Sequence, residues 1–263
     1  MTAPISAPAP DPRAPAGRQR FRHAARMEWI KLRSLRYPAW TLLLAVAGTA
    51  AAGAAAGFNT KNPSGDPTNN ILAGIALGQV AIGVLGVLTM TSEYSSGMIR
   101  ATLAAVPSRP LLLAAKATVL GAAALAAGQI ACFAAFLAGV AFLRPTVPHP
   151  ALSQPAVLRA VALTGAYLGL IGLIGLGLGT IIRHSAAAIT TLAGAVFVLP
   201  LLGPAQTPAG KFLPMLIAAN SLGAVKPQTS AGVLPPWAGL AIISLYAATL
   251  LTTGGILLTR RDT

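Results

Sequence analysis

The chain has 263 residues, of which 55% are hydrophobic and 9% charged, and its mean hydropathy is +0.70. A water-soluble domain must present more polar surface than this composition supplies, so the sequence excludes a soluble enzyme or binding domain. The formal net charge of +14 does not indicate nucleic-acid binding, which needs basic residues clustered on one folded surface. Abundant Ala and Gly suit closely packed helices. We therefore predict an all-α membrane protein with one membrane domain.

Two segments precede the first apolar stretch. Residues 1–17 are rich in Pro and Ala without an apolar period, which predicts a disordered tail. Residues 18–37 predict an amphipathic helix at the membrane surface. Its apolar stripe has helical spacing: Phe21, Ala25, Trp29 and Leu32. The alternative is a positively charged flank of the first span, since Glu28 and Lys31 interrupt the edges of the stripe.

Six segments are long and apolar enough to cross a hydrocarbon core of about 30 Å, which needs about 20 helical residues. They are residues 38–58, 71–91, 111–142, 157–182, 186–203 and 237–258. The third is long enough to tilt or to project into water. We predict a six-helix transmembrane domain over residues 38–263.

Lys and Arg are distributed unequally between the loops on the two sides, and the richer side is normally cytoplasmic. With the N-terminus on that side, the cytoplasmic segments hold fourteen of them: Arg13, Arg18, Arg20, Arg22, Arg26, Lys31, Arg33, Arg36, Arg100, Arg109, Lys116, Arg183, Arg260 and Arg261. The other side holds five: Lys61, Arg144, Arg159, Lys211 and Lys226. Both termini and residues 91–110 are therefore predicted to be cytoplasmic.

The loop at residues 91–110 contains Glu93, one of only five acidic residues in the chain. If the second span continues into this loop as a helix, Glu93, Gly97 and Arg100 share one face. An apolar stripe follows: Ile99, Leu103 and Val106. Pro107 ends it, so we predict a short cytoplasmic helix whose stripe is covered by lipid or by another protein. The alternative is that Glu93 and Arg100 form only a solvated contact within one helix.

Three stretches of this chain resemble segments of one known family. The loop stretch "SEYSSGMIRATLAAVPSRPLLLAAKA" resembles the signature between the second and third spans of ABC-2 type transporter permeases. "MEWIKLRSLRYPAW" resembles its interfacial connecting helix, and "GKFLPMLIAANSLGAV" resembles the region between spans five and six that dips into the membrane from outside. The resemblance is strong in the loop and weak elsewhere.

The resemblance implies that the loop is a coupling helix docked on a separate ATP-binding cassette ATPase subunit. That partner would bind ATP and Mg²⁺, and this chain would hold no cofactor. The residues of the coupling site would be Glu93, Gly97, Ile99, Arg100, Leu103, Val106 and Arg109. Those of the connecting helix would be Arg26, Glu28 and Lys31. Glu93 would pair with Arg26 or Lys31 and transmit motion between the two helices.

The family likeness also implies a dimer with a second permease copy, identical or related, in the cytoplasmic membrane of a bacterium. It would export a drug-like, antibiotic or lipid-like substrate along a path lined by spans one, two and five. The polar candidates on that path are Thr41, Gln79, Thr190 and Thr191. The alternative for each Thr is a bond to its own backbone. Two GxxxG pairs, Gly165/Gly169 and Gly175/Gly179, indicate close helix packing within the bundle or across the dimer.

The segment between the last two predicted spans is interrupted by proline. Pro200, Pro204, Pro208 and Pro214 break its first part. Irregular backbone at membrane depth needs shelter from lipid, so we predict short re-entrant or surface helices around residues 208–225 that form an external gate. A plain exposed loop is the alternative.

Groups for catalysis are scarce. The acidic residues are dispersed, the three His lie in separate segments (His23, His149 and His184), and Cys132 stands alone, so neither a catalytic constellation nor a metal site is indicated. With Lys116 counted as a loop cation, the apolar cores hold no ionisable residue, which disfavours ion-coupled transport. There is no Walker A motif.

We predict a non-catalytic transport subunit. The alternatives are a membrane anchor or sensor that recruits a soluble partner through residues 91–110 and, much less favoured, an intramembrane enzyme.

Overall fold

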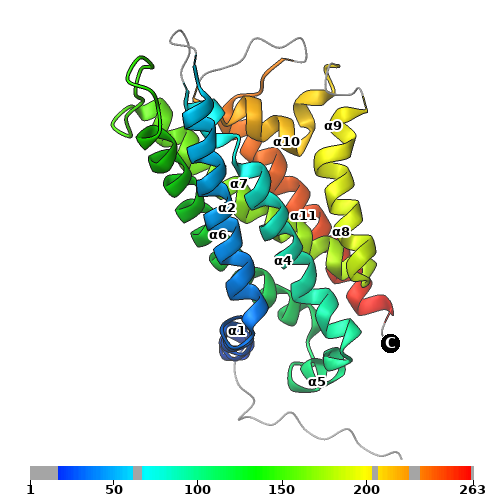
Figure 1. The fold of residues 1–263 in the computed structure, drawn as a ribbon. Helices are drawn as coiled ribbons and strands as arrows, with labels where there is room; N and C mark the ends of the chain where they lie inside the picture. The colour runs from blue at the N-terminus through cyan, green and yellow to red at the C-terminus, as the bar shows by residue number, and fades with distance from the viewer. Residues whose placement is uncertain (1–16, 62–66, 203–206, 225–231, 262–263) are drawn as a thin grey trace, which may run out of the picture.

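The computed structural model describes residues 17–61, 67–202, 207–224 and 232–261, and all regular elements within these ranges are helical (Figure 1). Five helices are long and apolar enough to cross a membrane. They are α2 (Arg36–Asn59), α4 (Ile75–Ser95) with the short α3 (Thr68–Leu72) before it, α6 (Arg109–Ala141), α7 (Pro155–Ile182) and α11 (Pro236–Arg261). The all-α membrane fold is thus confirmed. The predicted tail lies outside the described residues, except for Gly17.

Helix α7 is the centre of the bundle. Its most apolar window is 72% buried, against 22% for α2 and 17% for α11, and it packs on α4, α6 and α11. Helix α2 packs on α6 and α4 at the edge. An apolar residue exposed on an outer helix is well placed to face lipid.

Small residues bring α4, α6 and α7 into backbone contact. A Cβ atom on Gly175 would collide with the carbonyl oxygen of Gly83 on α4. A Cβ atom on Gly165 would lie 2.7 Å from the amide oxygen of Gln129 on α6. Both predicted GxxxG pairs therefore contribute to packing within the bundle, as expected where lipid gives apolar helices no reason to associate.

The fifth predicted span is shorter than the other five. The apolar helical stretch covers Ser185–Leu201 and consists of α8 (Ser185–Ala193), a π-helical turn at Gly194–Val198 and α9 (Leu199–Leu201). Six full spans are therefore not confirmed. The π turn widens the helix and shortens its rise.

Short helical turns follow α9 and lie at the same end of the bundle as α9 (Figure 1). They are a 3-10 turn at Gly210–Phe212, α10 (Pro214–Leu216) and a π turn at Ile217–Ser221. They fall within the range predicted for short helices, residues 208–225, of which residue 225 lies outside the described ranges, but each is only three to five residues long. Their entry into a membrane stays a prediction.

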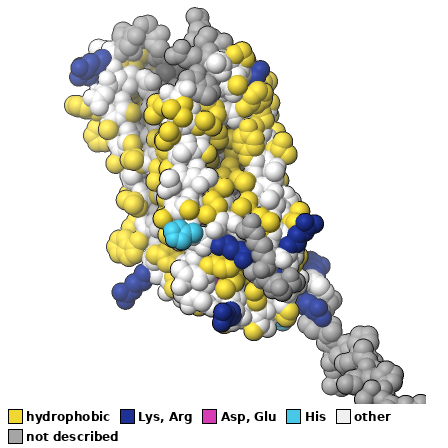
Figure 2. All heavy atoms as spheres, turned by 90° about the vertical axis from the view of Figure 1, so that its right-hand side faces the viewer, with side chains coloured by type: hydrophobic (Ala, Val, Ile, Leu, Met, Phe, Trp, Pro, Cys, Tyr) yellow, Lys and Arg dark blue, Asp and Glu magenta, His cyan; other side chains and the backbone are white. Residues whose placement is uncertain are grey.

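The opposite end of the bundle carries α1 (Gly17–Ser34), α5 (Met98–Ala105) and the end of α11 (Figure 1). In Figure 2 hydrophobic side chains cover the middle of the visible face, while Lys and Arg lie toward its two ends, mostly the end that carries α1. An apolar belt between charged ends is what a membrane protein needs.

Helix α1 packs only partly through its predicted apolar stripe, from which Leu32 contacts a core cluster. Ala24 and Glu28 are buried, whereas Trp29 is 49% exposed; Phe21, Ala25 and Leu32 are half-buried. The reason is that α1 packs on α6, which supplies a lysine to Glu28, so a charged residue takes the inward position.

Candidate functional site

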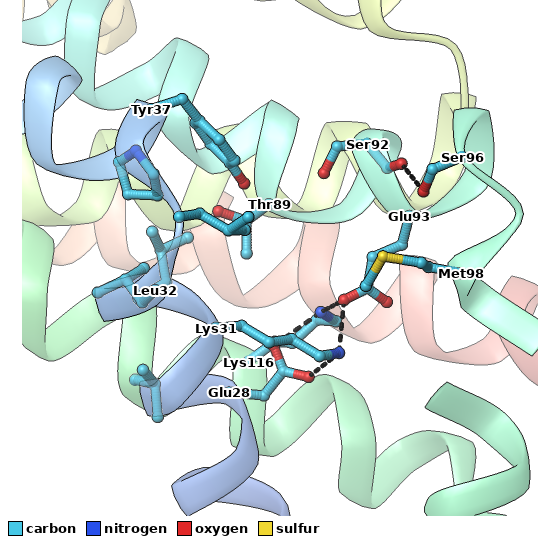
Figure 3. A pocket seen from close by; sticks show the side chains of 14 residues that line it. Glu28, Lys31, Leu32, Tyr37, Thr89, Ser92, Glu93, Ser96, Met98 and Lys116 are labelled. Atoms are coloured by element: carbon cyan, nitrogen blue, oxygen red, sulfur yellow. Dashed lines mark hydrogen bonds and ion pairs between the residues drawn. The ribbon is translucent and has the colours of Figure 1, made fainter. Parts of the chain in front are cut away.

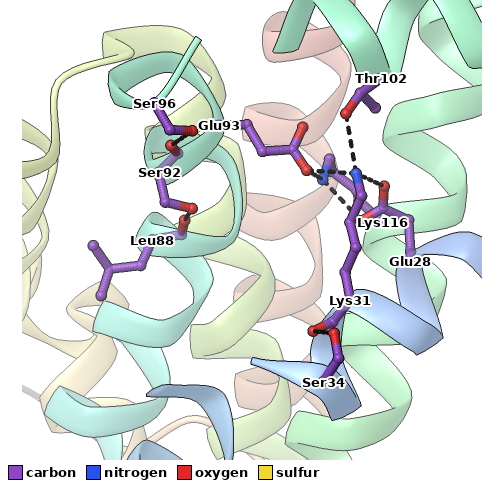
Figure 4. A network of polar contacts seen from close by, with 9 residues as sticks. All are labelled: Glu28, Lys31, Ser34, Leu88, Ser92, Glu93, Ser96, Thr102 and Lys116. Carbon is purple, nitrogen blue, oxygen red and sulfur yellow. Dashed lines mark hydrogen bonds and ion pairs between the residues drawn. The ribbon is translucent and has the colours of Figure 1, made fainter. Parts of the chain in front are cut away.

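Four charged side chains meet where α1, α4, α5 and α6 converge (Figure 4). Glu28 and Lys31 come from α1, Glu93 from the end of α4 and Lys116 from α6. We call these four residues the charge cluster. It contains both of the carboxylates that lie within the described ranges.

Each lysine bridges the two carboxylates. Lys31 Nζ lies 3.1 Å from Glu28 Oε1 and 2.8 Å from Glu93 Oε1. Lys116 Nζ lies 2.8 Å from Glu28 Oε2 and 2.6 Å from Glu93 Oε1. Two positive and two negative charges thus balance within one network.

The charge cluster is largely removed from solvent. The side chains of Lys116, Glu28 and Glu93 are 1%, 4% and 6% exposed, and only Lys31 is open, at 21%. An unpaired buried charge costs several kcal/mol, and pairing with hydrogen bonds offsets that cost. The four side chains therefore depend on one another, and a shift of one helix disturbs all of them.

Lys31 also ties the short helix α5 to this network. Its Nζ donates to Thr102 Oγ1 on α5 at 3.0 Å, and Thr102 is the buried residue of that helix. Burial lowers the pKa of Lys31, but the hydrogen bond from Lys31 to Glu93 and the nearby charge of Glu28 raise this pKa by more. The pKa of Lys31 is therefore raised overall. Lys31 is therefore held protonated at the junction of α1, α4 and α5.

One of the two predicted partners of Glu93 makes the expected contact. Lys31 pairs with it, whereas Arg26 is exposed. Glu28, predicted only as part of the connecting helix, accepts from both lysines.

Lys116 is the member of the charge cluster that sequence reasoning missed, because it was counted as a loop cation. Helix α6 already begins at Arg109, which places Lys116 about two turns inside it. A lone lysine in an apolar helix needs a carboxylate partner, and that requirement was the available signal. The prediction that the apolar cores lack ionisable residues is wrong at this position.

The loop does not continue α4 as one helix. Helix α4 ends at Ser95, and Gly97 has a φ of 71°, in the left-handed region, before α5 begins at Met98. Glu93 is buried while Arg100 is exposed. The predicted shared face of Glu93, Gly97 and Arg100 is therefore wrong, because the left-handed turn at Gly97 redirects the chain.

The apolar stripe of α5 faces the bundle instead of a free surface. Ile99, Leu103 and Val106 are half-buried, and Ile99 packs against the core group that includes Met90 and Leu113. The exposed face of α5 consists of other residues: Met98, Arg100, Ala101, Ala104 and Ala105. This face therefore presents three alanines, one methionine and one guanidinium group.

Arg109 is directed toward the end of α11. Its Nη1 donates to the carbonyl oxygens of Leu258 at 3.0 Å and Thr259 at 3.1 Å. Carbonyls in the last turn of a helix lack intrahelical donors, and a cation there is favourable. Arg109 thus links the start of α6 to α11, a contact that the predicted role in a partner site did not anticipate.

The other side of the α4 end contacts the turn between α7 and α8. The Arg183 guanidinium lies 4.9 Å from the centre of the Tyr94 ring, and Ser185 Oγ donates to Thr91 Oγ1 at 2.8 Å. The end of α4 is therefore held on both sides, by the charge cluster and by this turn.

The predicted pathway residues separate into two kinds. Thr41 and Thr191 donate to their own helix backbone, at Tyr37 O and Ala187 O, which confirms the alternative interpretation for them; Thr190 is exposed. Gln79 differs, since its Oε1 accepts from the buried Tyr167 hydroxyl at 2.8 Å. Gln79 also lines a cavity of about 100 Å³ beneath the turns at residues 214–221.

The described ranges contain no group of three His, Cys, Asp or Glu side chains that could hold a metal ion. His184 Nδ1 instead accepts from Ala187 N at 3.4 Å and caps the start of α8, and Cys132 is buried. No protein family matches the chain, and no curated protein is significantly similar to it.

Proposed function

We propose that this chain is the permease subunit of an ATP-driven exporter of the ABC-2 type, with ATP and Mg²⁺ bound by a separate ATPase subunit. The single observation that carries the proposal is the charge cluster, which joins the cytoplasmic helices α1 and α5 to the long helices α4 and α6. Such a connection is what a chain without its own energy source needs in order to receive mechanical work.

Force would enter at the exposed face of α5. A partner that pushes on Arg100 and Ala104 moves Thr102, and Thr102 is bonded to Lys31 of the charge cluster. Because interfaces repack between discrete arrangements, a small shift here can switch the bundle between inward- and outward-facing states. Both termini lie in the cytoplasm in this proposal, and the Ser185–Leu201 stretch is a sixth, shorter crossing.

The substrate path would lie between two permease copies, against the outer faces of α2, α4 and α8. These faces expose apolar side chains such as Trp40, Leu44 and Leu77, which suits a drug-like, antibiotic or lipid-like cargo. The turns at residues 210–221 would form the external gate, with Gln79 as a polar group beneath them.

The test is reconstitution of the full chain with its ATP-binding cassette partner in vesicles. We expect the two proteins to copurify and solute movement to require ATP hydrolysis. Ala104→Trp should block docking by steric clash, whereas Ala151→Trp, also at an exposed alanine but remote from α5, should not. Full transport by Ala104→Trp, or transport with no nucleotide hydrolysis, contradicts the proposal.

A non-transporting anchor or sensor is the second candidate. It is favoured by the small size of the two cavities beside Gln79, about 100 Å³ and 30 Å³. Vectorial movement of any solute in reconstituted vesicles would dismiss it.

A further inference from the structure

A cavity of about 240 Å³ lies beside the charge cluster (Figure 3). Residues from α1, the first turn of α2, the end of α4 and α6 form its wall. Most of that wall is apolar, with Leu35, Pro38, Met98 and Val119 among its residues. One water occupies about 30 Å³ of liquid volume, so the cavity has room for a larger group.

Glu93 lines this cavity and has one carboxylate oxygen without a partner. Both lysines of the charge cluster donate to Oε1, whereas Oε2 is buried and has no hydrogen-bond partner among the described residues. Figure 3 shows this second oxygen turned away from both lysines. Lys31 Nζ already contacts Glu28, Glu93 and Thr102, which uses its three N–H donors. Lys116 Nζ donates to Glu28 Oε2 and Glu93 Oε1, and in Figure 3 it lies on the side of Oε1. Glu93 Oε2 is therefore open to a donor from another molecule.

The hydroxyl groups on the same wall offer acceptors. Thr89 donates to Leu85 O at 2.8 Å, Ser92 to Leu88 O at 2.6 Å, and Ser96 to Ser92 O at 2.7 Å. Each proton is thus used on the backbone of α4, while each oxygen keeps lone pairs. Glu93 Oε2 and these hydroxyl oxygens are acceptors on the polar part of the wall, which also carries the Lys31 and Lys116 ammonium groups that Glu28 and Glu93 already bind.

We propose that this cavity binds a primary ammonium group carried on an apolar chain. Three N–H donors and a positive charge fit the unpaired Glu93 oxygen and the hydroxyl acceptors, and the apolar wall fits the adjoining methylene groups. The amine comes either from a lipid headgroup such as phosphatidylethanolamine or from a free alkylamine. A trimethylammonium group has the charge but no N–H donor, and an alcohol has a donor but no charge.

The test measures thermal unfolding of the purified full chain in detergent against three matched ligands, octylammonium, octyltrimethylammonium and octanol. We expect octylammonium to raise the unfolding midpoint with an apparent affinity at least about tenfold tighter than either analogue, because a charge-assisted hydrogen bond distinguishes it. Equal responses to the three ligands, or no response to octylammonium, would overturn the proposal in favour of unspecific partitioning or a water-filled cavity.

A second arm distinguishes the two sources of the amine. Native mass spectrometry of the chain from nanodiscs compares the retention of phosphatidylethanolamine with that of phosphatidylcholine of the same acyl chains. Preferential retention of phosphatidylethanolamine assigns the site to a lipid headgroup. Octylammonium binding without that preference assigns it to a free amine.

Two variants tie the binding to this cavity. Glu93→Gln removes the negative charge and should abolish the preference for octylammonium. Because Glu93 also holds the charge cluster, Val119→Phe serves as an independent variant that fills the cavity and leaves the cluster intact. Leu125→Phe, at an exposed position of the same helix, is its control. An undiminished octylammonium preference in folded Val119→Phe would overturn the assignment, and the assay needs no ATPase, so a failure of transport leaves it standing.

Discussion

Glu93 Oε1 and Lys116 Nζ lie 2.6 Å apart, and both side chains are almost fully buried between α4 and α6. Bulk water solvates neither charge. The pair is therefore stable only while both partners and their second contacts, Lys31 and Glu28, are present. Removing one member leaves the buried network with one unbalanced charge.

We expect Lys116→Met to lower the free energy of unfolding by about 3–5 kcal/mol, the usual effect of breaking a buried ion pair. The measurement is denaturant unfolding in detergent. Lys61→Met, at an exposed lysine, is the matched control and should change stability by about 0.5 kcal/mol or less. A Lys116→Met protein as stable as this control would show that the charge cluster does not stabilise the fold.

The elevated pKa of Lys31 predicts a loss of stability at high pH. A group whose pKa is higher in the folded than in the unfolded chain contributes fully below the unfolded value, here near 10.5, and its contribution disappears as the pH rises through the folded value. We expect the difference in unfolding free energy between the wild type and Lys31→Met to be constant from neutral pH to about 10 and to shrink above that. A difference that grows with rising pH would contradict the assignment.

Because Gly97 has a left-handed backbone conformation, we expect any side chain at this position to lower the free energy of unfolding. Gly97→Ala should lower the free energy of unfolding by about 1–2 kcal/mol, and Gly97→Asn by less, because Asn adopts this conformation more readily. Gly194→Ala is the control, since Gly194 has a φ of −58° in the right-handed region and an added Cβ meets nothing within 4 Å. That variant should be neutral or stabilising, by up to about 1 kcal/mol. Equal effects of the two alanine substitutions would remove the case for a required glycine at the α4–α5 turn.

The hydrogen bond between Tyr167 and Gln79 is buried, and we expect it to stabilise the fold. Tyr167→Phe should cost about 1–3 kcal/mol, because it leaves the Gln79 amide oxygen without its donor. Tyr246→Phe is the control, since Tyr246 donates to Phe212 O at an exposed position where water can replace it. In a double-mutant cycle, adding Gln79→Leu to Tyr167→Phe should recover part of the loss; strict additivity would contradict the coupling.

For residues 91–110, the sequence-based prediction was right about the contact between Lys31 and Glu93. It was wrong about the direction in which the chain leaves α4. Lys31 was one of two candidates for Glu93 because the resemblance to ABC-2 type permeases implied a pair between the loop and the connecting helix. The direction of α5 depended on a single backbone torsion at Gly97. A glycine after a helix end permits that angle without requiring it, so the sequence left open whether α4 continues through Gly97 or turns there.

By itself, the sequence determined that this protein is helical and belongs in a membrane, because the spacing and number of apolar residues act over short range and need no knowledge of the fold. Only the tertiary structure decided that Lys116 is buried, that Arg109 reaches α11, and that the fifth apolar stretch is shorter than the others. Those outcomes depend on which helices lie side by side, and Lys116 joins Glu28 across 88 positions of the chain, a distance over which local propensity carries no information.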